Sequence, residues 1–318
     1  MQPTSRRYRS DDYQRTKARQ QAAPLEFAPG RAILFALGRY GYLTAEQVRR
    51  LLYAPGSATF VTQWLKALKH AGLAHDDNWL RLNSTGKNPR VWTFTNKGRR
   101  ELLERQATEL PRAVHLRAPQ PWILEHTIAV NETLVTCELL TRRTGGVFPL
   151  LGLRSDELLH KAPITVQQDG KRFDVVPDGW VAYGFQGAPY RTFCIEVDRG
   201  TEVSTKWRSK IRAYVAALSG DPSPYKQTFG YSSTTVMTVV RPKEGVRIEP
   251  AEKRIADLKK WTELELAALG KRSQSWARVF RFTLLAPEET DPRIFFGSHS
   301  WEMPFQTAKS PLWEDVLG

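Results

Sequence analysis

The stretch VVPDGWVAYGFQGAPYRTFCIEVDRGTE, from Val175 to Glu202, sets four carboxylates among residues that favour β-strands. The segments FDVVPDGWVAYGF (173–185) and PYRTFCIEVDR (189–199) each predict a strand, and the short connection between them predicts that the two strands are neighbours. The four acids are Asp178, Glu196, Asp198 and Glu202. Either these acids end strands and form turns, or they converge to hold a metal ion.

Alternation along the second of these strands decides which side chains share a face of the sheet. In FCIEVD, the apolar residues at 193, 195 and 197 point to a core, and Glu196 and Asp198 point together to the opposite face. Two neighbouring carboxylates repel each other, and burial raises their pKa values, so the arrangement is costly without a cation. A hairpin would also bring Asp178 beside Glu196.

We therefore predict that Asp178, Glu196 and Asp198 are ligands of Mg²⁺ or Mn²⁺. Oxygen-only ligands suit such hard cations, which keep further positions for water and phosphate. The cation would make a water nucleophilic and stabilise charge on a phosphodiester. Lys206 and Lys210 lie one helical turn apart in the next predicted helix, and we expect one of them to neutralise the scissile phosphate.

The same residues have purely structural interpretations, which the sequence leaves open. Residues 177–179, Pro-Asp-Gly, are a strong β-turn signature, because proline presets φ and glycine accepts a positive φ. Asp198 precedes Arg-Gly and could simply end a strand, and Glu202 suits a helix N-terminus because of the helix dipole. Two lysines on an amphipathic helix often form no more than a solvated face.

Around this stretch, residues 120–286 predict an α/β domain with the element order α-β-β-β-α-β. Helix patterns cover residues 121–143, 204–220 and 250–269, and the other strand patterns cover residues 146–155, 234–242 and 277–285. The strand at 234–242 is strongly apolar, as expected for a strand buried on both faces. Prolines place a linker near residues 108–120, and residues 287–318 form an aromatic-rich tail of unassigned role.

Residues 29–110 predict a helix-turn-helix module followed by a hairpin. Thr44 and Gln47 form a capping box at the start of the second helix, and Ser57 caps a longer third helix. Residues 80–94 then alternate as strands around a loop that contains glycine and lysine, which is the pattern of a wing. The module therefore predicts a winged helix-turn-helix.

In such a module the third helix reads DNA in the major groove. The residues that we expect to contact DNA are Thr59, Thr62, Gln63, Lys66 and Lys69 on the outer face of this helix and Lys87 and Arg90 on the wing. The alternatives are a structural three-helix module and a winged helix that binds protein.

Charge also favours a polyanionic partner. The 318-residue chain carries a formal net charge of +14, and its first 110 residues hold 19 Lys and Arg against 9 Asp and Glu. Duplex DNA is the first partner to expect, an acidic membrane surface is the second, and a solvated basic surface is the alternative to both.

Nothing in the sequence predicts export or insertion into a membrane. Residues 1–28 predict a disordered basic tail that lacks the apolar region of a signal peptide. No apolar run is long enough to span a bilayer. The two cysteines, Cys137 and Cys194, stand in apolar segments without metal-ligand spacing, which fits a reducing cytoplasm.

Pro177-Asp178, followed after 17 residues by Glu196-Val197-Asp198, resembles the signature of PD-(D/E)xK nucleases, and α-β-β-β-α-β resembles the core of the restriction-endonuclease-like fold. Asp198 stands where that signature has lysine. Some members move the lysine to the following helix, so the resemblance implies a catalytic role for Lys206 or Lys210, although the departure equally fits a domain without catalysis. Glu125 matches an auxiliary acid of some of these nucleases, and His126 is a weaker match.

The whole layout, over about residues 30–240, resembles the replication-relaxation family. The similarity runs from VWTFTNKGRRELL (91–103), which is similar to the ending of many winged helix-turn-helix domains, through PDGW and IEVDRGTE to the K-x-x-x-K-x-x-x-Y pattern of residues 206–214. Proteins of this family occur on plasmids and integrated mobile elements and are linked to plasmid replication and DNA relaxation.

The sequence therefore predicts a cytoplasmic DNA-binding protein of a mobile element, with a metal-dependent nuclease-like domain that nicks or cleaves DNA. The alternative is a non-catalytic accessory factor of replication or mobilisation, or a transcription regulator, that uses the nuclease fold to bind or dimerise. A third possibility is an adaptor that binds protein only. The expected partners are double-stranded DNA, a second copy of the chain and a protein of the mobile element.

Overall fold

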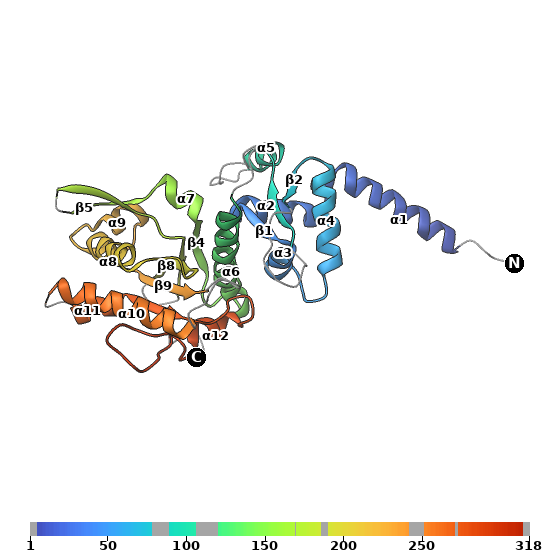
Figure 1. The fold of residues 1–318 in the computed structure, drawn as a ribbon. Helices are drawn as coiled ribbons and strands as arrows, with labels where there is room; N and C mark the ends of the chain where they lie inside the picture. Colours follow the sequence, from blue (N-terminus) through green and yellow to red (C-terminus); the bar gives the residue numbers. More distant parts are fainter. Residues whose placement is uncertain are drawn as a thin grey trace. The chain divides into compact units, whose positions relative to one another are not determined.

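The computed structural model describes residues 5–77, 89–105, 120–168, 170–185, 190–241, 251–270 and 273–313. The chain divides into two compact units, Met1–Ile128 and Ala129–Gly318 (Figure 1). Both units mix helices and strands, and each is described separately below.

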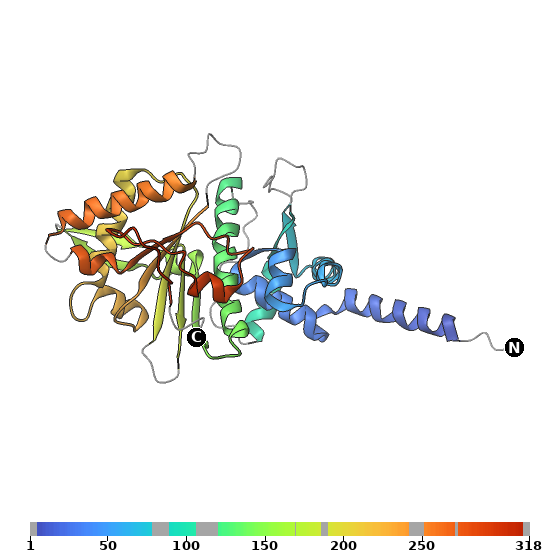
Figure 2. The same ribbon diagram turned by 90° about the horizontal axis from the view of Figure 1, so that it is seen from below.

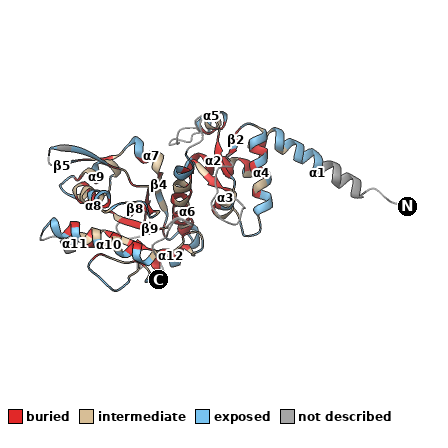
Figure 3. Cartoon of the chain, viewed as in Figure 1, coloured by how far each residue is buried: buried red, intermediate tan, exposed pale blue. Residues whose placement is uncertain are grey.

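A helix, α1 (Ser5–Ala22), occupies the segment for which the sequence predicts a disordered tail. The segment is rich in Arg, Gln and Ala, which favour helices, and the part of α1 whose burial is described is almost entirely exposed (Figure 3). Arg19 near its end pairs with Glu26 of the short helix η1 (Pro24–Glu26), with 2.7 Å between Nη2 and Oε2. The expectation of disorder for this segment therefore differs from the structure, in which α1 is helical and contacts η1 and α4.

The first unit continues as a small antiparallel sheet packed against helices. Its further elements are α2 (Ala28–Tyr40), β1 (Tyr42–Thr44), α3 (Ala45–Leu52), α4 (Ala58–His70), β2 (Ala74–Asp77), β3 (Val91–Phe94) and α5 (Asn96–Glu104). The strands lie in the order β1-β3-β2. Ile33, Val48 and Leu65 of the helices are fully buried with Trp92 and Phe94 of β3 and form the core.

Both predicted cap residues stand at the start of a helix of this unit, but only Thr44 caps its helix with its side chain. Thr44 accepts a hydrogen bond from the Gln47 backbone N–H, and the Gln47 side chain accepts one from the Thr44 N–H, which completes the capping box of α3. Ser57 precedes α4 as predicted, but its side chain makes no capping hydrogen bond. A close approach requires Gly98 in α5, because a Cβ there would lie 2.2 Å from the Leu73 carbonyl oxygen.

The second unit is built on a mixed sheet in the order β10-β9-β8-β7-β4. Following α6 (Pro121–Arg143), which begins in the first unit, the elements are β4 (Leu150–Ser155), α7 (Asp156–Lys161), β5 (Ile164–Gln168), β6 (Lys171–Val175), β7 (Gly179–Tyr183), β8 (Arg191–Asp198), α8 (Ser204–Leu218), α9 (Pro224–Phe229), β9 (Thr235–Val240), α10 (Ala251–Ala268), α11 (Ser273–Ala277), β10 (Phe280–Thr283) and α12 (Pro292–Gly297). β8 is antiparallel to β7 and parallel to β9.

The strand predicted over residues 173–185 is two strands in the structure. β6 pairs with β5 in a separate two-stranded sheet, and β7 joins the central sheet. Pro177 lies between them, and proline cannot donate a ladder hydrogen bond, so the chain changes sheets there. The strand β5 and the helix α7 were not predicted.

The two faces of the central sheet have different covers. Cys194 and Trp180 face a core that includes residues of α8 and α10. On the opposite face, the rings of Tyr183 and Phe193 contact Phe296 of α12 and Trp313 of the C-terminal segment, which is red in Figure 2. The aromatic-rich tail therefore packs on the sheet through residue 313, the last that the structure describes.

In the part of the chain that is described, no helix combines the length and the apolar character needed to cross a bilayer.

Candidate functional site

Asp178, just before β7, and Glu196, near the end of β8, lie beside each other in the central sheet. Gly179 is the register partner of Ile195, so Asp178, one residue before β7, lies level with Glu196 on β8. The Val197 backbone N–H donates a 2.7 Å hydrogen bond to Asp178 Oδ2. The predicted approach of these two acids is therefore present in the structure.

Two side chains of α8 hold the Glu196 carboxylate. Lys210 Nζ lies 2.8 Å from Oε2, and the Tyr214 hydroxyl donates a 2.5 Å hydrogen bond to Oε1. Lys210 and Tyr214 are four residues apart, so they lie on one face of the helix. Glu196 is only 2% exposed, and these two partners compensate much of the cost of burying its charge.

Burial and mutual charge shift the pKa values of this cluster. Burial raises the pKa of Glu196 to about 7, and the Asp178 carboxylate adds to the rise while Lys210 opposes it. Burial disfavours the charge on Lys210, but Glu196, Asp178 and Glu202 outweigh it and raise the Lys210 pKa above its ordinary value. Burial also raises the pKa of the Tyr214 hydroxyl, and Glu196 raises it further. Tyr214 therefore remains a hydrogen-bond donor.

Asp198 shares the face of Glu196, as alternation predicts, but its carboxylate binds an arginine. Arg254 of α10 donates from Nε to Oδ2 and from Nη2 to Oδ1, both at 2.7 Å, and Asp198 is 3% exposed. The Gly200 N–H donates to Oδ2 at 3.1 Å. A planar guanidinium matches a carboxylate with two parallel bonds. Asp198, for which the sequence predicts a metal ligand, thus ties β8 to α10.

The other predicted catalytic residues are placed differently. Lys206 is exposed on α8, so Lys210 is the lysine that contacts the acids. Glu202 Oε1 lies 3.5 Å from Lys210 Nζ, and Glu202 Oε2 is buried without a hydrogen-bond partner. Glu125 and its neighbour His126 lie on α6 within the first unit and are partly buried.

The donor set decides which cation the cluster suits. Among the described residues, no group of three or more His, Cys, Asp or Glu side chains is arranged to hold a metal ion. Asp178 and Glu196 provide two carboxylates, and Mg²⁺ binds through one or two carboxylates while it keeps several waters. A Mg²⁺ or Mn²⁺ ion held by this pair would have no ligand from Asp198 and would compete with Lys210 and Tyr214 for the oxygens of Glu196.

The predicted DNA-contact residues lie on the first unit. Thr59, Gln63, Lys66 and Lys69 are exposed on α4, whereas Thr62 is partly buried and donates to the Ala58 carbonyl at 2.9 Å. Arg90, before β3, is exposed as well, and Lys87 lies outside the described residues.

A buried acid that the sequence did not single out joins the two cationic elements. Asp76 on β2 binds Lys69 through Oδ1 and Arg90 Nη1 through Oδ2, the latter at 3.2 Å. The Asp76 side chain is 3% exposed, so it holds the end of α4 beside the start of β3. One weak signal for the Lys69–Asp76 pair was available, because these two residues flank the turn at Ala71 and Gly72. By contrast, nothing in the sequence near Arg254 or Asp198 indicated that these two residues pair.

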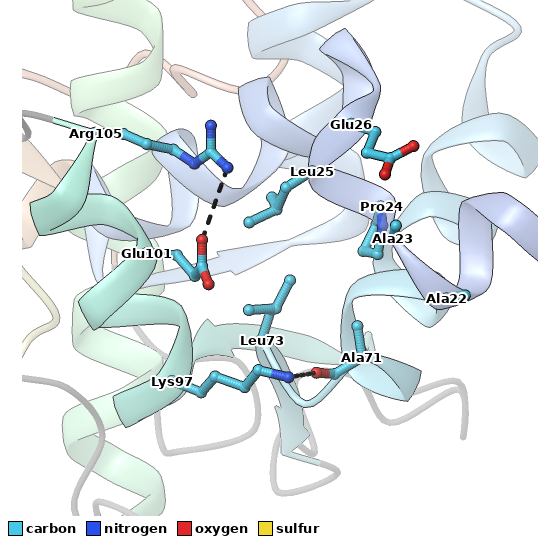
Figure 4. Close-up of a pocket in the computed structure, with 10 residues that line it drawn as sticks. All are labelled: Ala22, Ala23, Pro24, Leu25, Glu26, Ala71, Leu73, Lys97, Glu101 and Arg105. Atoms are coloured by element: carbon cyan, nitrogen blue, oxygen red, sulfur yellow. Dashed lines mark hydrogen bonds and ion pairs between the residues drawn. The ribbon is translucent and has the colours of Figure 1, made fainter.

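A cavity of about 410 Å³ in the first unit lies between η1 and α5 (Figure 4). Its charged side chains already have protein partners. Lys97 donates to the Ala71 carbonyl at 2.9 Å, Arg105 lies 3.7 Å from Glu101, and Glu26 is paired with Arg19. None of the predicted site residues lines this cavity.

Comparison with known proteins identifies one relationship. A family model described as replication-relaxation matches residues 34–230. This segment includes α3, α4, the acids Asp178 and Glu196, and Lys210. No curated protein and no solved structure matches the chain significantly.

Proposed function

This chain belongs to the replication-relaxation family, and we propose that it binds duplex DNA of a mobile element and nicks or cleaves it with a metal-dependent nuclease-like domain. The first unit would select the site on DNA, and the second would carry the reaction. The support comes from the exposed cationic helix of the first unit and from the convergence of two acids and one lysine in the second.

For the first unit we propose a winged helix-turn-helix that places α4 in the major groove. The order α2, β1, α3, α4, β2, β3, with the strands arranged β1-β3-β2, is compatible with this architecture. Gln63 and Lys66 project from the exposed side of α4, where a base edge or a phosphate could accept their hydrogen bonds. Arg90 would contact the backbone beside the groove.

For the second unit we propose a restriction-endonuclease-like domain. The succession α6, β4, β7, β8, α8, β9 supports this assignment once β5, β6 and the short helices are treated as insertions. Asp178 and Glu196 would hold Mg²⁺ or Mn²⁺, which supplies an activated water and stabilises charge on the phosphodiester. Lys210 would neutralise the scissile phosphate, and Tyr214 would orient Glu196 by its hydrogen bond.

The observation that carries this proposal is the placement of Asp178 beside Glu196 with Lys210 at 2.8 Å from the Glu196 carboxylate. The test incubates supercoiled plasmid with the protein and a series of Mg²⁺ and Mn²⁺ concentrations. We expect metal-dependent nicking or linearisation, which Asp178→Asn and Glu196→Gln each abolish while gel retardation of duplex DNA persists. Asp174→Asn, an exposed acid on β6, serves as the matched control and retains cleavage.

A second function is favoured by one specific observation. Both oxygens of Glu196 already accept hydrogen bonds from protein side chains, and Asp198 is held by Arg254. A cluster with its own cation is also what a non-catalytic DNA-binding or dimerisation domain would contain. This alternative predicts that the plasmid stays intact under every metal condition although the protein retards duplex DNA.

A further inference from the structure

Four aromatic rings of the second unit form a continuous series, which we call the aromatic strip. Trp180 of β7 stacks on Phe229 of α9, with centroids 4.6 Å apart and planes 9° apart. Tyr231 lies 5.8 Å from Trp180, and Tyr190 lies 5.5 Å from Tyr231. The strip therefore runs from a buried ring to a side chain that opens to solvent.

Exposure increases along the strip. Trp180 is 5% exposed, Phe229 and Tyr231 are partly buried, and Tyr190 is 62% exposed. Trp180 is firmly held, because its Nε1–H donates a 2.9 Å hydrogen bond to the Tyr225 hydroxyl. A Cβ at residue 152 would lie 2.8 Å from the indole ring, so only glycine leaves room for this ring position. The exposed end thus rests on a rigid base.

Cationic side chains accompany the rings. The Arg154 guanidinium lies 5.5 Å from the centroid of Phe229 and 5.9 Å from that of Trp180. Lys226 of α9, three residues before Phe229, is half exposed, with Asp221 3.7 Å away, whereas Arg191 shares the opposite face of the sheet with Phe193. A surface that alternates aromatic faces with guanidinium and ammonium groups matches a chain of bases linked by phosphates.

The strip also lies on the same sheet face as the acids. Trp180 is the register partner of Cys194, which shares the face of Glu196 two residues further along β8. Asp178 precedes Trp180 by two residues, a separation of about 7 Å along an extended chain. The buried end of the strip, Trp180, is therefore the end nearer to Asp178 and Glu196, and the exposed end, Tyr190, lies just before the start of β8.

We propose that the aromatic strip binds single-stranded DNA, with unpaired bases stacking on Tyr190 and Tyr231 and phosphates contacting Lys226. Bases in a duplex are already stacked on one another, so an exposed tyrosine gains most from a strand that has been separated. This inference rests on the proposed function in DNA replication or relaxation, and it adds a single-stranded substrate to the duplex bound by α4.

The test measures binding of the full chain to a fluorescent oligothymidylate of about 20 nucleotides and, separately, to a duplex of equal length by anisotropy. Tyr190→Ala should weaken binding of the single strand roughly 10-fold, and Tyr190→Phe should restore it, because stacking needs the ring and not the hydroxyl. Lys226→Ala should reduce the slope of log affinity against log salt by about 0.7. Phe305→Ala, an exposed aromatic of the C-terminal segment, is the matched control.

The outcomes separate this inference from the proposed function. No binding of the oligothymidylate by the native chain, or equal binding by native protein and Tyr190→Ala, overturns the inference and leaves duplex binding and cleavage standing. Equal loss of single-strand and duplex binding in Tyr190→Ala also overturns it, since the strip would then be a general DNA contact. Single-strand binding without duplex retardation supports the inference and removes the proposed role of α4.

Discussion

The Lys210 ammonium lies 2.8 Å from the Glu196 carboxylate, which is 2% exposed. Asp178, level with Glu196 on the adjoining chain, and Glu202 also act on this ammonium. One lysine thus balances several acids at the end of β8. The same ammonium offsets part of the negative charge there and would present a cation to a phosphate.

Lys210 should matter for stability in a way that Lys206, one turn earlier on α8, does not. Lys210→Met leaves Glu196 buried without its counter-charge and should lower the free energy of unfolding by about 3 kcal/mol. Lys206 is exposed, so Lys206→Met should change it by about 0.5 kcal/mol or less. Urea denaturation of the two variants checks this, and similar losses from both would contradict the structural importance of the ion pair.

Stability should depend on pH through Glu196. Burial raises the pKa of this carboxyl from 4.5 to about 7, so the folded state retains the proton where the unfolded state has lost it. The free energy of unfolding should therefore fall as pH rises between these values, by up to ~1.4 kcal/mol per pH unit. Glu196→Gln should flatten this part of the profile, whereas Asp174→Asn should leave it unchanged. A profile that is equally steep in Glu196→Gln would assign the titration to another group.

The Arg254–Asp198 pair should stabilise the second unit without taking part in metal binding. Arg254→Met leaves a buried carboxylate unpaired and should cost about 3–5 kcal/mol in thermal or urea unfolding. Arg254→Lys should recover little, because an ammonium cannot form the two parallel bonds. Arg293→Met, which removes a more exposed partner of Asp291, should cost less than about 1 kcal/mol.

The same pair offers a check on the metal ligands. Asp198→Asn should leave the dependence of plasmid cleavage on Mg²⁺ concentration unchanged once the protein is folded, whereas Asp178→Asn should abolish cleavage. A weakened response to Mg²⁺ in a folded Asp198→Asn protein would mean that Asp198 is a ligand of the metal ion.

Asp76 should restrain DNA binding by the first unit. Asp76→Asn removes the charge that holds Lys69 and Arg90, so both cations become available to phosphates. We expect tighter duplex binding at low salt and a steeper salt dependence, by about 0.9 in log–log slope for each added phosphate contact. Fluorescence anisotropy over a salt series measures this. Unchanged slopes would mean that neither cation faces the DNA.

Short-range features of this protein follow from the sequence alone. The capping box of Thr44 and Gln47 and the common face of Glu196 and Asp198 depend on residues within four positions of each other. Such features are set by helix and strand geometry, so they need no knowledge of the rest of the chain. The approach of Asp178 to Glu196 was also predictable, since a short connection joins their strands.

Only the tertiary structure decided which partner each carboxylate has. Alternation places Glu196 and Asp198 on one face, but Lys210 reaches the first, and Arg254, 56 residues away, reaches the second. The division of residues 173–185 between two sheets was likewise invisible, because a strand pattern is the same whichever strand it pairs with. Local periodicity fixes the direction in which a side chain points, whereas the partner that it meets depends on how distant helices pack. Two acids can therefore share one face of a strand without sharing a cation.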